Sequence, residues 1–275
     1  MTNPRDALEA VGKLPDVEID IAATALQLAR IDTPDADWRA AEARLTDLAR
    51  DAARLALTQT DDRPTIRAET LTGLVALHHG YRGDADTYDD FANANLIKVT
   101  ERKKGLPVAL GVIWLHAARA AGWPAHGLDF PGHFLIAIEG KGAQAVVDVF
   151  SGGTPMDARD LRHLIKRVEG PDAELRPGVL LPMSARAVLM RLQNNIKLRR
   201  LQSGDFTGAL ACAEDMLRLA PDAAGLWREA ATMHQRFGHV AAALRCYQQF
   251  LTLVPQGEAA THVRAAMDAL RSRLN

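Results

Sequence analysis

Residues 105–124 read GLPVALGVIWLHAARAAGWP, and this stretch decides how the chain around it is arranged. Pro107 suits the first turn of a helix, where its missing N–H is not needed, and Gly122 suits the residue that ends one. Residues 108–121 carry almost no charge. A helix this apolar is expected to be buried on most of its sides. The sequence therefore predicts a domain packed around one central helix.

Three short runs rich in apolar residues follow that helix, and Gly and Pro separate them: residues 125–130, 133–138 and 145–150. Runs of this kind are typical of β-strands joined by tight turns. We expect them to form a small antiparallel sheet packed on the central helix. A two-residue turn at Gly140-Lys141, with Gly first as a type II′ turn favours, would place Glu139 opposite Gly142.

The same register brings a histidine to a carboxylate. Counting back from the turn places His133 opposite Asp148, and directly opposed residues have Cβ atoms about 4.5–5.5 Å apart, close enough for a hydrogen bond between the side chains. Asp148 stands in an apolar strand, where a buried carboxylate needs a partner. A four-residue loop would instead place His133 opposite Phe150.

The chain before residue 80 is predicted to be helical. Apolar residues return at helical spacing between residues 17 and 58, and the turn residues Thr33-Pro34-Asp35 divide this region into two helices. Asp35 or Asp37 would cap the second helix. A third helix over residues 64–78 would end at Gly80 in the left-handed conformation.

A basic cluster of Arg102, Lys103 and Lys104 stands just before the central helix. Backbone N–H groups at a helix start attract anions, so these three residues are candidate ligand-binding residues. The favoured alternative is a solvated turn on the surface.

The C-terminal region repeats itself after 34 residues. The matching pairs include Gly204 with Gly238, Cys212 with Cys246, Leu217 with Leu251 and Pro221 with Pro255. This period, with Gly after one helix and Pro after the next, resembles tetratricopeptide repeats. We expect about two helical hairpins with Trp227 in the groove between them, and a final helix over residues 262–274. The predicted domains are residues 1–182 and residues 183–275.

The segments around the central helix resemble the transglutaminase-like core. They are Gly105-Leu106-Pro107, the run from Arg119 to Ala125, His133-Phe134-Leu135 and Val147-Asp148. Arg102 to Pro107, Phe130 to Leu135 and the repeats that follow are similar to the bacterial SirB-type branch, which joins this core to tetratricopeptide repeats. The resemblance implies an α+β, mostly helical fold with N-terminal helices, a transglutaminase-like core and C-terminal helical hairpins.

The resemblance also implies a site. Active members use a cysteine thiolate at the helix N-terminus, a His on one strand and an Asp that orients it on the next. In this chain His133 and Asp148 match the last two, and the nucleophile position falls on Pro107. Residues 101–150 contain no Ser, Thr or Cys, so no shift of the alignment restores a nucleophile. The His and Asp would then be a vestigial catalytic pair.

The composition of the chain argues against several classes of function. A net charge of -1 argues against a nucleic-acid partner, and no apolar run is long enough to span a membrane. The N-terminal residues lack the apolar region of a secretory signal, and Cys212 and Cys246 are the two cysteines, so we expect a cytoplasmic protein without a disulfide framework. The histidines show no metal-ligand spacing, and the adjacent His78 and His79 would face different ways on a helix. No metal or cofactor is expected.

The sequence thus favours a non-catalytic protein with a regulatory role. It would bind a protein partner through its repeats, or a small ligand in the vestigial active-site cleft of the transglutaminase-like core. The alternative is a hydrolase or lyase that uses water activated by His133 and Asp148, or a nucleophilic lysine at Lys103 or Lys104.

Overall fold

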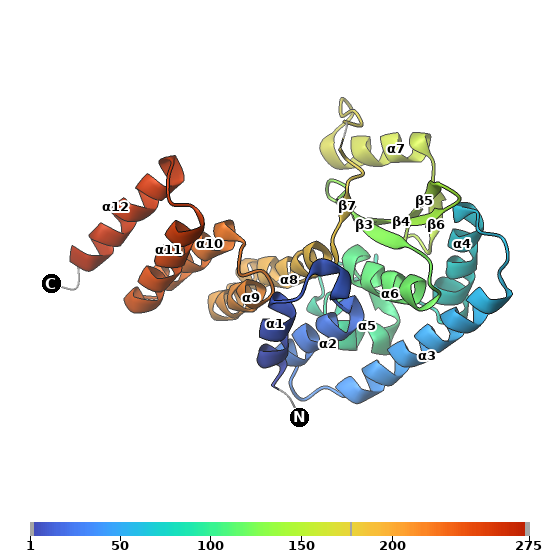
Figure 1. The fold of residues 1–275 in the computed structure, drawn as a ribbon, viewed down its shortest axis with the longest axis horizontal. Helices are drawn as coiled ribbons and strands as arrows, with labels where there is room; N and C mark the ends of the chain where they lie inside the picture. Colours follow the sequence, from blue (N-terminus) through green and yellow to red (C-terminus); the bar gives the residue numbers. More distant parts are fainter. Residues whose placement is uncertain (1–2, 177, 273–275) are drawn as a thin grey trace. The chain divides into compact units, whose positions relative to one another are not determined.

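The computed structural model describes residues 3–176 and 178–272, which form two compact units (Figure 1). The core unit is Leu14–Leu192. The repeat unit joins the residues up to Lys13 with those from Gln193 onward. The border lies within helix α8 (Ala185–Gln202). The sequence-based division between residues 182 and 183 stays a proposal.

The core unit begins with helices, as predicted. Helix α2 (Ile21–Asp32) is followed by α3 (Trp38–Thr58), which Asp37 caps by accepting a hydrogen bond from the Ala40 N–H at 3.0 Å. Helix α4 (Pro64–Leu71) continues into a π-helical turn, Thr72–His78, and Gly80 ends it with a φ of 76°. Of the two predicted caps for α3, Asp37 therefore takes that role.

Helix α6 (Pro107–Ala120) is the predicted central helix, and Pro107 occupies its first turn. Its residues from Pro107 to Leu115 are all buried, together with Ala117 and Ala118. It packs against α2 and α3 and also against two strands of the sheet, β3 (Ala125–Leu128) and β4 (Leu135–Gly140). The prediction of a helix buried on most sides is confirmed.

The sheet has five strands in the order β6-β5-β4-β3-β7, all antiparallel. Strand β5 (Ala143–Asp148) completes the three that were predicted, and β6 (Thr154–Met156) and β7 (Pro182–Met183) extend the two edges. Helix α7 (Ala158–Glu169) covers one face of the sheet, while α4 and α6 lie on the other (Figure 1). The sheet is thus covered by helices on both faces.

The favoured hairpin register was wrong by two residues, and the alternative pairing, that of a four-residue loop, is the one observed. Glu139 pairs with Gln144, and Gly140 pairs with Ala143, so the turn residues are Lys141 and Gly142. Both have positive φ, 48° and 72°, as a type I′ turn requires. The type I′ turn suits the right-handed twist of the two strands, and Gly142 adopts its conformation without strain.

Three helices were not predicted. They are α1 (Pro4–Gly12), α5 (Leu96–Arg102) and α7. The signal for α7 was present in the sequence: Asp157 caps it, and Leu161, Leu164 and Ile165 recur at helical spacing on its buried face. Among residues 3–176 and 178–272, no helix is both long and apolar enough to cross a bilayer.

The repeat unit contains α1, the end of α8, and helices α9 (Phe206–Leu219), α10 (Ala224–Arg236), α11 (Val240–Leu253) and α12 (Glu258–Ser272). Helices α9 and α11 begin and end 34 residues apart, which confirms the repeat. Gly204 and Gly238 turn the chain before them with φ values of 80° and 71°. The final helix starts earlier than predicted, and residues 273 and 274 of that prediction lie outside the described residues.

Helix α1 packs against α9 within this unit. The Arg5 guanidinium lies 2.9 Å from the carboxylate of the buried Asp215, and Gly12 lies so close to the Arg218 carbonyl that a Cβ would overlap it. Helix α1 thereby packs on the repeat unit as an additional helix.

Candidate functional site

His133 and Asp148 are in contact, although His133 is not in a strand. It lies in the turn before β4, where its N–H donates to the Phe130 carbonyl at 3.1 Å. The His133 Nε2 lies 3.0 Å from Asp148 Oδ1. Arg191 on α8 fixes the same turn by donating to the His133 carbonyl at 2.6 Å. The observed register, if extended, would place His133 opposite Phe150. The turn, and not strand pairing, therefore brings the imidazole to Asp148.

Asp148 accepts hydrogen bonds from other groups besides the His133 imidazole. Its Oδ1 also accepts hydrogen bonds from the backbone N–H groups of Phe150 and Ser151, at 3.0 and 3.3 Å, and its Oδ2 accepts one from the Ser151 hydroxyl at 2.8 Å. Burial opposes ionisation of this carboxyl, but the hydrogen bonds from His133 and Ser151 outweigh it and hold its pKa below the usual value. Asp148 thus closes the turn after β5.

Ser151 supplies a hydroxyl one residue beyond the segment 101–150 that lacks one. Its proton is directed at Asp148 and not at His133, so the bond serves the turn. The other contact of His133 is aromatic: its ring meets the Phe150 ring edge-on at a centroid distance of 6.3 Å, and Tyr88 meets Phe150 in the same way at 5.7 Å. The imidazole is therefore held between a carboxylate and a ring.

Pro107, the mapped nucleophile position, is buried in the first turn of α6. The residue before it, Leu106, is held by a hydrogen bond from its N–H to the Asn93 carbonyl at 2.8 Å. Proline offers neither a nucleophile nor a backbone N–H at this helix start.

The basic cluster is largely paired within the chain. Arg102 donates to the buried carboxylate of Asp84 at 2.8 Å, and the Lys104 ammonium lies 3.8 Å from the same carboxylate. Lys103 donates to the Tyr81 hydroxyl at 3.0 Å and lies over its ring at 4.1 Å. Burial lowers the pKa of the Lys103 amine. These contacts support a structural role for the cluster, and its predicted anion binding stays a prediction.

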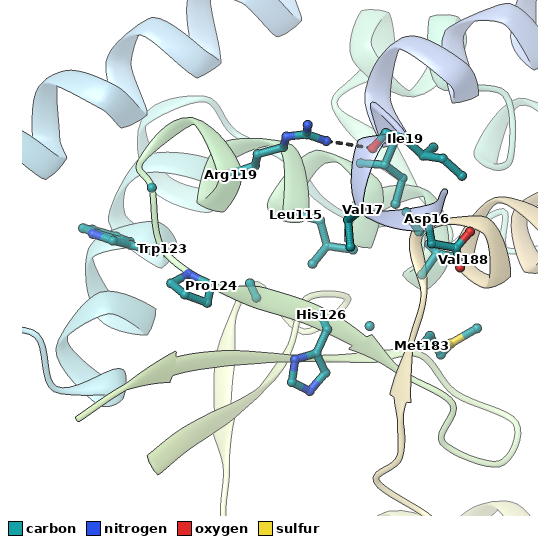
Figure 2. Close-up of a pocket in the computed structure, with 15 residues that line it drawn as sticks. Asp16, Val17, Ile19, Leu115, Arg119, Trp123, Pro124, His126, Met183 and Val188 are labelled. Atoms are coloured by element: carbon teal, nitrogen blue, oxygen red, sulfur yellow. Dashed lines mark hydrogen bonds between the residues drawn. The ribbon is translucent and has the colours of Figure 1, made fainter. Parts of the chain in front are cut away.

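A cavity of about 400 Å³ lies at the C-terminal end of α6, where Arg119 stands (Figure 2), whereas Pro107 is in the first turn of that helix. Arg119 on α6, His126 on β3 and Met183 on β7 contribute to its lining (Figure 2). Arg119 donates to the Ile19 carbonyl at 2.7 Å, and His126 lies 3.0 Å from the Glu139 carboxylate. Since α6 is about 20 Å long by helix geometry, this cavity is separate from the position of the predicted nucleophile.

A larger groove, of about 770 Å³, lies in the repeat unit. Helices α1, α9, α10 and α11 contribute its lining, which contains both charged and apolar side chains. Trp227 is half-buried at this groove, and its indole N–H donates to the Pro221 carbonyl at 2.8 Å. The predicted place of Trp227 in the groove is confirmed.

A cluster of Asp51, His78 and His79 was not predicted from the sequence. The prediction that His78 and His79 face different ways was wrong: one donor atom from each, with an Asp51 oxygen, all lie within 4.8 Å of one another. The two rings are in edge contact with centroids 5.0 Å apart. No sequence spacing indicated this, because Asp51 and the two histidines come from different helical segments.

Comparisons with known proteins agree with this architecture. The family model described as Transglutaminase-like superfamily matches residues 39–194, and a Tetratricopeptide repeat model matches residues 196–268. A UPF0162 protein of Xylella fastidiosa (strain Temecula1) is 34% identical over 64% of this chain, and the match spans 64% of that relative's own length.

Two further relatives extend the comparison. A UPF0162 protein of Vibrio cholerae is 27% identical over 92% of this chain and 93% of its own, and Protein SirB1 of Salmonella typhimurium is 24% identical over 74% of this chain and 76% of its own. The solved structure of menin covers 90% of this chain and 65% of its own at 12% identity, with a TM-score of 0.43, which is too low to support an argument. With a central helix on an antiparallel sheet followed by helical repeats, this chain belongs to the transglutaminase-like superfamily, in its SirB-type branch.

Proposed function

We propose that this chain is a non-catalytic, cytoplasmic member of its superfamily that binds an acidic segment of a protein partner in the groove of the repeat unit. The observation that carries the proposal is the groove itself, which is about 770 Å³ in volume and is lined by helices α1, α9, α10 and α11. Tetratricopeptide repeats generally use such surfaces for protein–protein interaction.

The charges of the groove support an acidic partner. Glu9 pairs with Arg218 at 3.6 Å, and Glu214 pairs with His234 at 3.3 Å, so both groove carboxylates already have cationic or imidazole partners. Lys13 and Arg245 also line the groove, and neither forms an ion pair with a residue that the structure describes. Two cations are thus available to carboxylates of a bound segment.

The core unit supports the absence of catalysis. The mapped nucleophile position is the buried Pro107, and residues 101–150 supply no hydroxyl or thiol in its place. The His133–Asp148 pair meanwhile has a structural task, because Asp148 also ties down the turn at Ser151. In this proposal the core unit is a scaffold, the groove of the repeat unit binds the partner, and the role of the protein is regulatory.

A photocrosslinking amino acid at Gln249, which lines the groove, tests the proposal in lysate of the native host. We expect one acidic protein to be captured, and capture to be lost when Arg245→Glu reverses a groove charge. Arg236→Glu, on the exposed end of α10, is the matched control and should leave capture unchanged. Capture that survives Arg245→Glu, or that Arg236→Glu abolishes equally, would count against the groove as the binding surface.

A further inference from the structure

The cluster of Asp51, His78 and His79 brings three metal-ligating side chains together in the core unit. Asp51 Oδ2 lies 3.1 Å from His79 Nε2, and the donor atoms of all three residues lie within 4.8 Å of one another. We propose that these residues bind a divalent transition-metal ion, with Zn²⁺ the best fit.

The fold builds this arrangement with an unusual helical turn. Asp51 is on α3, and His78 is the last residue of the π-helical segment after α4. His79 follows it, and its N–H donates to the Leu74 carbonyl five residues back at 2.9 Å. Consecutive side chains of an α-helix point about 100° apart, since 3.6 residues complete a turn. The wider π-helical turn reduces that angle, and the donor atoms of His78 and His79 lie near the same Asp51 oxygen. Turns of this kind occur frequently at functional sites.

The distances suit zinc. Zinc binds imidazole nitrogen and carboxylate oxygen at about 2.0–2.2 Å, so tetrahedral ligand atoms lie roughly 3.3–3.6 Å apart. Asp51 and His79, at 3.1 Å, already have nearly that spacing. His78 is exposed, so a small rotation of its side chain closes the remaining distance without disturbing the core. Two imidazoles and one carboxylate also favour zinc over Mg²⁺, which prefers oxygen ligands.

Open space adjoins two of the three proposed ligands, Asp51 and His78. A cavity of about 440 Å³ beside the cluster is lined by Asp51, His78 and Thr70, among others. Three protein ligands with an accessible fourth position leave room for water or for a small ligand on the metal.

Two nearby cations oppose metal binding. Arg54 lies 3.9 Å from Asp51, but it faces Oδ1 and leaves Oδ2, the oxygen beside His79, for the metal. Lys103 also acts on His79 through its charge, although its ammonium donates to the Tyr81 hydroxyl at 3.0 Å. Each of the two cations thus has a contact other than with Asp51 Oδ2.

Calorimetric titration of the chelator-treated full-length chain with ZnCl₂, and separately with MgCl₂, tests the proposal. We expect one zinc ion per chain, no binding of Mg²⁺ at equal concentration, and a Zn²⁺ affinity that His78→Ala weakens by about tenfold or more. His163→Ala removes an exposed histidine of α7 and is the matched control, which should bind as the parent does.

Replacing zinc by Co²⁺ adds a spectroscopic readout, because a tetrahedral nitrogen and oxygen site gives a visible absorption band that His78→Ala should abolish. Absence of zinc binding to the parent chain overturns the proposal. So does zinc binding that His78→Ala leaves unchanged, because the ion would then sit elsewhere.

Discussion

Replacing Asp148 by alanine removes the single carboxylate that four hydrogen-bond donors share. These are the His133 ring, the Phe150 and Ser151 backbone N–H groups and the Ser151 hydroxyl. Asp148 is 5% exposed, so water replaces few of these bonds. Removing one partner of such a buried charged network costs about 3–5 kcal/mol of unfolding free energy. His133→Phe removes one of the four donors and should cost about 1–2 kcal/mol.

The double variant should then cost less than the sum of the two single variants, by about 1–2 kcal/mol. Urea unfolding followed by tryptophan fluorescence measures this. A Trp227→Phe background confines the signal to the core unit, because the other tryptophans, Trp38, Trp114 and Trp123, all lie there. If the two single changes add to within about 0.5 kcal/mol, the 3.0 Å contact carries no coupling and the reasoning fails.

Three further predictions concern the repeat, the mapped nucleophile position and pH. Trp227→Ala should cost about 2–3 kcal/mol, because the half-buried indole packs on the repeat core and bonds Pro221; an unchanged thermal midpoint would contradict this. Pro107→Cys should give a thiol with a pKa below the free value of about 8.5, measured by thiolate absorbance; a higher value would argue against the site mapping. Because the pKa of Asp148 is lowered on folding, its stabilisation is present above about pH 4, its unfolded pKa, and is lost as pH falls through the folded pKa. The stability difference between the parent and Asp148→Asn should therefore shrink in acid, and a difference that stays constant from neutral to acidic pH would refute this.

The features that sequence predicted best have local chemical signals. Pro107 and Gly122 mark the two ends of the central helix, and an apolar run between them leaves little choice of structure. The repeat was equally clear, because Gly204 and Gly238 stand in the same backbone conformation one period apart. Signals of this kind depend only on nearby residues and not on the tertiary structure.

The contact of His133 with Asp148 was predicted, but from a register that was wrong. The sequence favoured a two-residue turn at Gly140-Lys141 and left open a four-residue loop, whose strand pairing is the one observed. The structure places Lys141 first, at positive φ, a conformation that sequence does not signal for lysine. His133 still reaches Asp148 because a turn, and not strand pairing, aims its ring.

The cluster of Asp51, His78 and His79 could not have been predicted in this way. Asp51 comes from one helix and the two histidines from another, and their meeting depends on how α3 packs beside the π-helical turn. Adjacent histidines in an ordinary α-helix would diverge, so residue spacing alone predicts no shared site. The backbone hydrogen bond from the His79 N–H to the Leu74 carbonyl, five residues back, leaves no trace in that spacing.

The four bonds that Asp148 accepts also change how the evolution of this family should be understood. Losing the carboxylate would loosen the turn at Ser151 and release His133, so natural selection for a folded domain is enough to keep both residues. A lineage that lost its cysteine long ago would still carry an intact His and Asp. The presence of such a pair in a related chain would therefore follow from the stability of the fold alone and would not by itself indicate enzymatic activity.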